Sequence, residues 1–146
     1  MPEQISGQRI TKETKYNGKN IKAFISPNWT LEYDIALGEL QKEFYTAVLR
    51  AEKIQNSDTY ALTHEKIAEV YDKVETDFIS WTSTKKTEQE IAKAIYEDYM
   101  LDKKISKAIV AQCFAVLLKE SEGIKDRIER DNKLKYLVDA INYVTE

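Results

Sequence analysis

The chain has 146 residues, of which 42% are hydrophobic and 32% charged, a composition typical of one soluble domain with a core of its own. Its four glycines and two prolines are too few for an all-β fold, which needs a turn about every ten residues. The formal net charge of -3 excludes the basic profile of an autonomous nucleic-acid-binding domain. Any contact with DNA would therefore come from a local patch or from another part of a larger assembly.

The N-terminal third of the chain begins with polar sequence that alternates weakly. Residues 8–12 alternate enough for a short strand, residues 16–19 form an Asn-Gly type turn, and residues 20–26 form a second short strand. An isolated hairpin is marginal in water. We therefore expect these strands to lean on helices, or to be the edge of a sheet whose remainder is absent from this chain.

Helical periodicity dominates from residue 31 onward. Apolar residues recur at helical spacing from Leu31 to Gln55, which predicts one long amphipathic helix. Thr63 is a plausible N-cap for a second helix. Thr87 and Glu90 have the spacing of a capping box, which predicts that a third helix begins there.

The C-terminal part of the chain predicts two more helices. The helix that follows Ser106 is apolar nearly all round, which favours a central position in a bundle. Residues 120–132 form a charged, partly helical connection, and residues 134–144 form a last amphipathic helix. We expect a mainly α fold, a bundle of about five helices with one or two short β-strands at the N-terminal end. Residues 1–30 form the strand-containing end segment and residues 31–146 the helical bundle, together one compact unit.

The single cysteine and the N-terminus indicate the compartment. Cys113 is the only cysteine, which excludes an internal disulfide, and its apolar neighbours predict a small buried side chain on a helix. The first residues lack a basic segment followed by an apolar one, so no signal peptide is expected. No apolar run approaches the roughly 20 residues that span a bilayer. We expect a cytoplasmic protein that does not enter the membrane.

Two acidic residues follow the predicted strand-to-helix turn. Glu32 and Asp34 lie in the first turn of the helix that begins near Leu31. Carboxylates at the open edge of a sheet can hold a divalent metal. They can equally complement the positive end of the helix dipole. Both interpretations remain open from the residues alone.

Three segments together resemble the C-terminal part of the Toprim nuclease region in ATP-dependent endonucleases of the OLD (overcoming lysogenization defect) family. They are residues 24–34 (FISPNWTLEYD), 105–112 (ISKAIVAQ) and 136–145 (YLVDAINYVT). The similarity extends over roughly residues 8–146. In that family an ABC-type ATPase precedes the Toprim domain, and a helical segment follows the last Toprim strand. The predicted strands would then be the remnant of a Toprim α/β sheet.

The resemblance implies roles for individual residues. Glu32 takes the position of a late acidic metal ligand, with Asp34 as its stand-in. Lys107 matches the catalytic lysine, which neutralises the charge that develops on the scissile phosphate in the transition state. The intact enzyme would use two Mg²⁺ or Mn²⁺ ions, whereas no cofactor is expected for the isolated chain. Lys85 and Lys86 are alternative lysines because they also precede a helix, and all of these residues can equally be solvated surface.

Several features of the family are missing from this chain. The sequence contains no P-loop, and the region before residue 20 has no room for the family's glutamate motif or its Asp-x-Asp strand. We therefore expect an excised, split or degenerate C-terminal portion of a DNA endonuclease of phage defence, inactive alone. Its partners would be DNA and the missing ATPase and Toprim portion, and a homodimer stays open. The alternative is a non-enzymatic helical protein–protein interaction module that docks through its exposed strand edge.

Overall fold

The computed structural model describes residues 22–145 of the chain, and this part is mainly helical. The helices are α2 (Leu31–Leu37), α3 (Gln41–Gln55), α4 (His64–Ser83), α5 (Glu88–Ile95), the π-helix η1 (Tyr96–Leu101), α6 (Lys107–Glu120), α7 (Ile124–Glu129), the 3₁₀ helix η2 (Asn132–Leu134) and α8 (Lys135–Thr145). The prediction of a mainly α fold is confirmed. Among residues 22–145 there are seven α-helices, more than the five expected.

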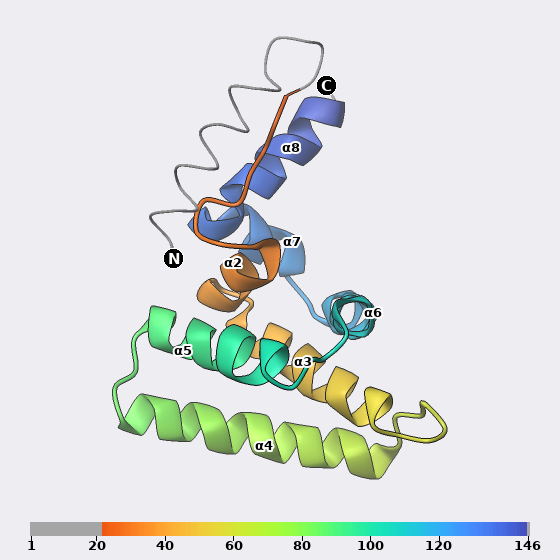
Figure 1. The fold of residues 1–146 in the computed structure, drawn as a ribbon. Helices are drawn as coiled ribbons and strands as arrows, with labels where there is room; N and C mark the ends of the chain where they lie inside the picture. The colour runs from red at the N-terminus through yellow and green to blue at the C-terminus, as the bar shows by residue number, and fades with distance from the viewer. Residues whose placement is uncertain (1–21, 146) are drawn as a thin grey trace.

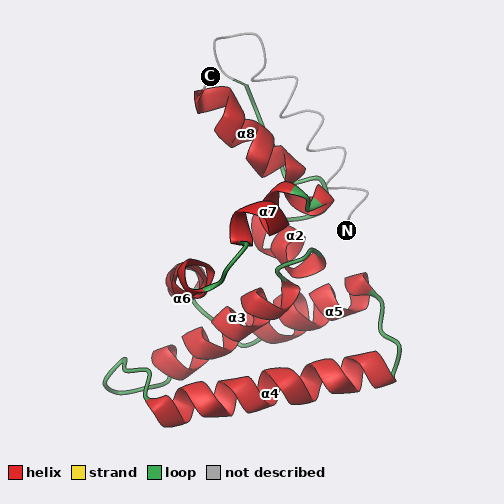
Figure 2. Cartoon of the chain, turned by 180° about the vertical axis from the view of Figure 1, so that it is seen from behind, coloured by secondary structure: helices red, strands yellow, loops and turns green. Residues whose placement is uncertain are grey.

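The helices surround α3. Helix α4 runs along one side of α3 and α5, while α2 and α7 lie on the other side and α8 extends away from them (Figure 1, and Figure 2 from behind). Helix α3 supplies the largest share of the buried core, namely Phe44, Tyr45, Ala47, Val48, Leu49 and Ala51. It packs against both α6, where Phe44 contacts Phe114, and α4, where Tyr45 contacts Phe78 and Trp81. Helix α3 is therefore the central helix of the bundle.

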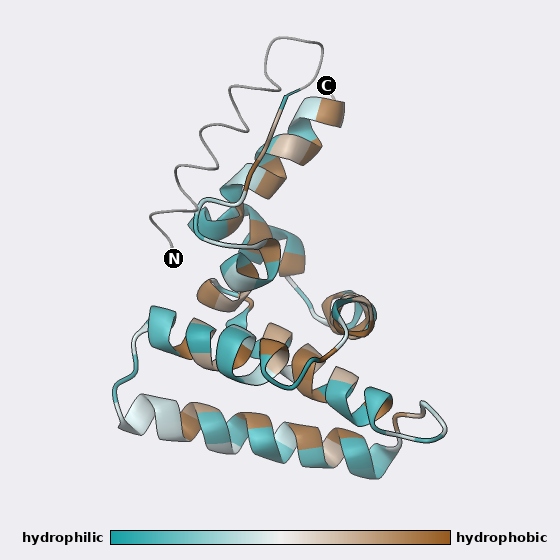
Figure 3. Cartoon of the chain, in the orientation of Figure 1, coloured by the Kyte–Doolittle hydropathy of each residue, from teal (hydrophilic) through white to brown (hydrophobic). Residues whose placement is uncertain are grey.

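The prediction that the helix after Ser106 is central was wrong. Helix α6 is apolar over much of its surface (Figure 3), but it buries only Val110 and Cys113. Val116 on the same helix is 50% exposed. Because α6 packs mainly on α3, one face of it is covered and its remaining apolar residues stay partly accessible.

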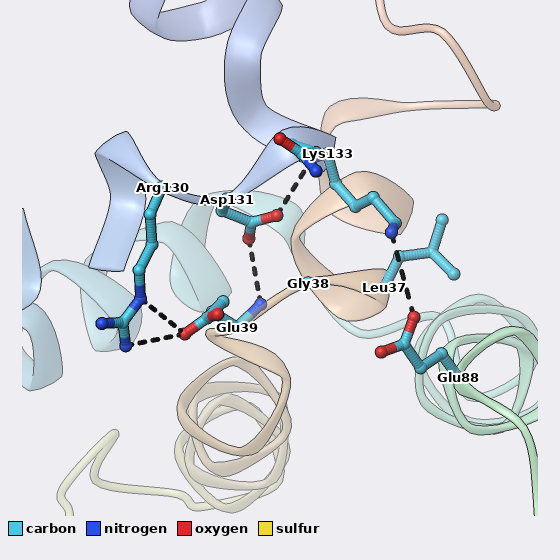
Figure 4. Close-up of a pocket in the computed structure, with 8 residues that line it drawn as sticks. Leu37, Gly38, Glu39, Glu88, Arg130, Asp131 and Lys133 are labelled. Atoms are coloured by element: carbon cyan, nitrogen blue, oxygen red, sulfur yellow. Dashed lines mark hydrogen bonds and ion pairs between the residues drawn. The ribbon is translucent and has the colours of Figure 1, made fainter. Parts of the chain in front are cut away.

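The long helix predicted from Leu31 to Gln55 is broken at Gly38. Gly38 is extended, with φ −98° and ψ −159°, and ends α2. Behind it, the Asp131 carboxylate accepts a hydrogen bond from the Glu39 backbone N–H at 3.0 Å. A Cβ at position 38 would overlap that carboxylate, so the close approach requires a glycine (Figure 4). The apolar periodicity continues across the break, which is why the sequence predicts a single helix.

The predicted helix starts are confirmed. The hydroxyls of Thr63 and Ser106 accept hydrogen bonds from backbone N–H groups three residues later. Thr87 and Glu90 form a complete capping box. The charged connection at 120–132 is partly helical, as predicted, because it contains α7.

The N-terminal strands are not seen in the part of the chain that the structure describes. Residues 22–26 are not part of a β-strand, and the ring of Phe24 lies 5.7 Å from the Tyr143 ring of α8. The predicted strand at 20–26 is therefore not formed over its described part. The predicted strand at 8–12 and turn at 16–19 lie outside the described residues, and the division at residue 30 stays a prediction. No helix among the described residues is long and apolar enough to cross a membrane.

Candidate functional site

The candidate site lies at the start of α2, where Thr30 fixes the first helical turn. The Thr30 hydroxyl accepts a hydrogen bond from the Tyr33 N–H at 3.2 Å, as an N-cap residue does. Glu32 and Asp34 both lie in this turn. Residues two apart on a helix do not share a face, so the two carboxylates have different surroundings.

Glu32 lies beside Lys107, the first residue of α6. The distance from Lys107 Nζ to Glu32 Oε1 is 3.5 Å, and the side chains are 54% and 24% exposed, respectively. The ammonium also lies 5.8 Å from the centre of the Tyr96 ring. The fold therefore brings together two residues that the resemblance assigns to one site, although they are far apart in the sequence.

The surroundings of Lys107 favour its charged form. Burial acts to lower the pKa of the ammonium, but the Glu32 carboxylate and Tyr96 together outweigh it, so the pKa is raised. A lysine with a raised pKa stays protonated at neutral pH. Lys107 is therefore suited to binding an anion and unsuited to acting as a base.

Asp34 has a different environment, because it is completely buried. One of its oxygens accepts a hydrogen bond from the Ser26 hydroxyl and the other from the Asn28 amide, the latter at 2.9 Å. Burial raises the pKa of the Asp34 carboxyl, while the hydrogen bonds from these two residues oppose the increase. Both oxygens are engaged by the loop that precedes α2, so this geometry makes Asp34 an anchor of that loop and favours Glu32 as the candidate metal ligand.

Tyr136 of α8 completes the surroundings of Asp34. Its hydroxyl is buried and lies against the Asp34 carboxyl, although the contact falls outside ordinary hydrogen-bond geometry. Burial and the nearby carboxylate raise the pKa of Tyr136. The sequence did not single out Ser26, Asn28 or Tyr136 as partners of Asp34. The one local signal was the pair of small polar residues on either side of Pro27, a composition typical of loops that bond to a helix start.

Of the remaining residues, the alternative lysines are not paired with Glu32, whereas Trp29 packs against the Tyr96 ring beside Lys107. Lys85 and Lys86 form no ion pair with any residue that the structure describes. The Trp29 ring lies 5.5 Å from Tyr33 and 5.1 Å from Tyr96, centre to centre. These contacts place Trp29 within an aromatic cluster that supports the Glu32 side of α2.

The described residues do not by themselves form a metal centre. No group of three or more His, Cys, Asp or Glu side chains between residues 22 and 145 has an arrangement that could hold a metal ion. A two-metal centre needs several carboxylates around paired ions. Glu32 alone does not fit that requirement, so further acids would have to come from outside the described residues.

A polar cavity of about 320 Å³ lies at the junction of α2 and α3 (Figure 4). Four of the charged residues in its lining form ion pairs: Arg130 with Glu39 at 3.0 Å, and Lys133 with Glu88 at 3.9 Å. The Asp131 carboxylate accepts from two backbone N–H groups. These contacts hold the segment after α7 against the α2–α3 junction and join η2 to the start of α5.

In comparisons with known proteins, no family model, curated protein or solved structure matches this chain. The function is therefore argued from the arrangement of its residues.

Proposed function

We propose that this chain is the C-terminal portion of a Toprim-type, divalent-metal-dependent DNA endonuclease of the OLD family. In this proposal Glu32 contributes one acidic group to the nuclease centre, and Lys107 contributes a cation that faces the phosphate. The observation that carries the proposal is the approach of Lys107 Nζ to Glu32 Oε1, at 3.5 Å across α2 and α6.

The state of the Glu32–Lys107 pair suits such a role. Lys107 has a raised pKa and remains an ammonium ion at neutral pH. Partly exposed ion pairs contribute only about 0–1 kcal/mol to stability. The pair can therefore open readily, and the ammonium can then donate charge-assisted hydrogen bonds to a phosphate oxygen.

The isolated chain is inactive in this proposal. One carboxylate and one lysine do not assemble a two-metal centre, and the remaining acids of the family's site belong to the Toprim portion that would precede this chain. The chain supplies the helical framework that holds Glu32 and Lys107 next to each other.

The test joins this chain to an upstream segment that carries the glutamate motif and the Asp-x-Asp strand. Nicking of supercoiled plasmid is then followed with Mg²⁺ or Mn²⁺. Glu32→Gln and Lys107→Met should each lower the nicking rate by about 100-fold or more, the effect of losing one group that stabilises the transition state. The matched controls are Glu65→Gln, in the first turn of α4, and Lys119→Met, in the last turn of α6.

Two results would contradict the proposal. Full activity of both the Glu32 and the Lys107 variants would show that neither residue contributes to the nuclease centre. Metal-dependent nicking by the isolated chain would show that the centre is complete without upstream acids.

The second candidate function is a protein–protein interaction module. The module was expected to dock through an exposed strand edge, which residues 22–26 do not form. Helix α4, however, exposes Tyr71 at 64% and Ile79 at 66%. An open groove of about 510 Å³ runs beside Ile79 and is also lined by Lys42, Glu75, Phe78, Thr82 and Ser83.

Sedimentation velocity over a range of protein concentrations tests this second function as a homodimer. Self-association that Ile79→Asp abolishes, and that the control Val144→Asp on α8 preserves, would favour the module. A monomer at every concentration would count against the homodimer.

A further inference from the structure

Arg50 of α3 is a partly buried cation. Its Nε atom is inaccessible to solvent and has no hydrogen-bond partner. The guanidinium forms no ion pair with any residue between 22 and 145, whereas Arg127 and Arg130 are paired with Glu43 and Glu39. Burying a charge is unfavourable unless the charge is paired or hydrogen-bonded. The inaccessible Nε–H of Arg50 therefore lacks the acceptor that a buried donor ordinarily has, and an anionic oxygen beside it would supply one.

A cavity of about 190 Å³ adjoins Arg50. It lies between α3, α6 and the loop that joins α3 to α4. It is lined by Arg50, Ile54, Leu62, Gln112, Cys113 and Val116. The lining contains hydrophobic side chains, one neutral amide, one thiol and one cation, and it contains no carboxylate. The charge of Arg50 is therefore not neutralised within the cavity.

The volume sets the size of a ligand. An apolar protein cavity of about 150 Å³ holds one benzene molecule. A cavity of about 190 Å³ has room for roughly six to eight non-hydrogen atoms on the same scale. This is the size of a short-chain organic acid.

We propose that this cavity binds a small aliphatic monocarboxylate. The carboxylate forms paired hydrogen bonds with the Arg50 guanidinium, whose planar fork matches a carboxylate group. The hydrocarbon part lies against Ile54, Leu62 and Val116. This site is separate from Glu32 and Lys107 and is independent of the nuclease proposal.

The lining favours a carboxylate over inorganic phosphate. Phosphate near neutral pH carries more charge and more polar oxygens, and a single guanidinium would leave most of them unpaired against apolar side chains. A monocarboxylate places one charge on the one cation and fills the remaining space with hydrocarbon. Neutral molecules of the same shape would leave Arg50 unpaired.

The binding test uses the whole chain and 4-methylpentanoate as the probe, followed by ¹H–¹⁵N NMR. We expect saturable shifts centred on Arg50, Ile54 and Gln112. The neutral isostere 4-methylpentanamide and inorganic phosphate should each bind at least tenfold more weakly. Arg50→Met should weaken binding of the acid at least tenfold, while the matched control Arg130→Met should leave it unchanged.

Cys113 gives a second readout that needs no substitution at Arg50. Cys113 is 7% exposed and lines the cavity, so an occupied cavity covers its thiol. In the unsubstituted protein, 4-methylpentanoate should slow alkylation of Cys113 severalfold, and the amide should not.

Several results would overturn the proposal. Equal binding of the acid and the amide would show that the ligand's charge does not contribute to binding. Tighter binding of phosphate than of the acid would show that the hydrocarbon part does not contribute. Shifts away from the cavity, or Cys113 alkylation unchanged by saturating acid, would place the ligand elsewhere. Tighter binding of a peptide with a C-terminal leucine than of the free acid would reassign the site to a protein partner.

Discussion

Gly38→Ala tests whether the break between α2 and α3 depends on Asp131. The backbone at Gly38, with φ −98° and ψ −159°, is open to any residue, so alanine adds no backbone strain. The added Cβ would instead overlap all three carboxylate atoms of Asp131. Asp131 is 5% exposed, and its carboxylate accepts from the N–H groups of Glu39 and Lys133, each at 3.0 Å.

The expected effect is the difference between two opposing contributions. Displacing the carboxylate weakens hydrogen bonds to a charged acceptor, each worth about 1.5–3 kcal/mol, and overpacking alone is unfavourable by about 1–3 kcal/mol. Replacing glycine by alanine restricts the unfolded chain and returns about 0.4–1 kcal/mol. Gly38→Ala should therefore lower the free energy of unfolding by about 1–3 kcal/mol.

A double-mutant cycle in urea, followed by circular dichroism at the helix band, isolates the contact. In an Asp131→Ala background the overlap is gone, so Gly38→Ala should be neutral or stabilise by about 0.4–1 kcal/mol. Gly123→Ala is the matched control. Gly123 has open space around it but a φ of +68°, so its effect comes from backbone strain and should be the same in both backgrounds. Equal destabilisation by Gly38→Ala with and without Asp131 would refute the explanation of the helix break.

Three further predictions concern stability and reactivity. Asp34 has a pKa raised above 3.8 by burial, so the native state binds more protons than the unfolded state and the free energy of unfolding should fall as pH rises from about 4 through the folded-state pKa. Urea denaturation at several pH values should show this slope in the unsubstituted protein and lose it in Asp34→Asn. Burial raises the pKa of the Cys113 thiol and the charge of Arg50 partly offsets this, so Arg50→Met should slow alkylation of Cys113 further at pH 8. An unchanged rate would contradict the influence of Arg50 on the thiol. Thr87→Ala should destabilise by about 0.5–2 kcal/mol, whereas the exposed neighbour Lys86→Ala should change stability by less than about 0.5 kcal/mol.

The parts of the fold that the sequence predicted are the local ones. The capping box of Thr87 and Glu90, and the caps at Thr63 and Ser106, are confirmed because a cap involves residues only three apart. The break at Gly38 was missed because Asp131, whose carboxylate lies against Gly38, is far away in the sequence. Helix α6 was wrongly predicted to be central. Its composition shows how apolar it is but not how many neighbouring elements cover it.

The candidate site, like the fold, was predictable from the sequence only in part. That Glu32 approaches Lys107 was expected from the resemblance, and the periodicity of either helix alone does not indicate it. The unpaired state of Arg50 left no trace in the sequence, because an arginine on an amphipathic helix ordinarily reaches solvent. Only the packing of α3 against α6 and the loop before α4 isolates its Nε atom.

Glu32 and Asp34 show why position in a motif does not decide a role. Both carboxylates lie in the first turn of α2, and the resemblance assigns the metal-ligand position to Glu32 with Asp34 as its stand-in. Because the residues are two apart, the turn that presents Glu32 to Lys107 directs Asp34 into the protein, where Ser26 and Asn28 engage its oxygens. Asp34 thereby holds the loop before α2 in place, and that loop carries Trp29, which packs on Tyr96 beside Lys107. Asp34 is thus connected to the Glu32–Lys107 pair through this loop, and a loss of the proposed nuclease activity on its substitution would not by itself identify a metal ligand.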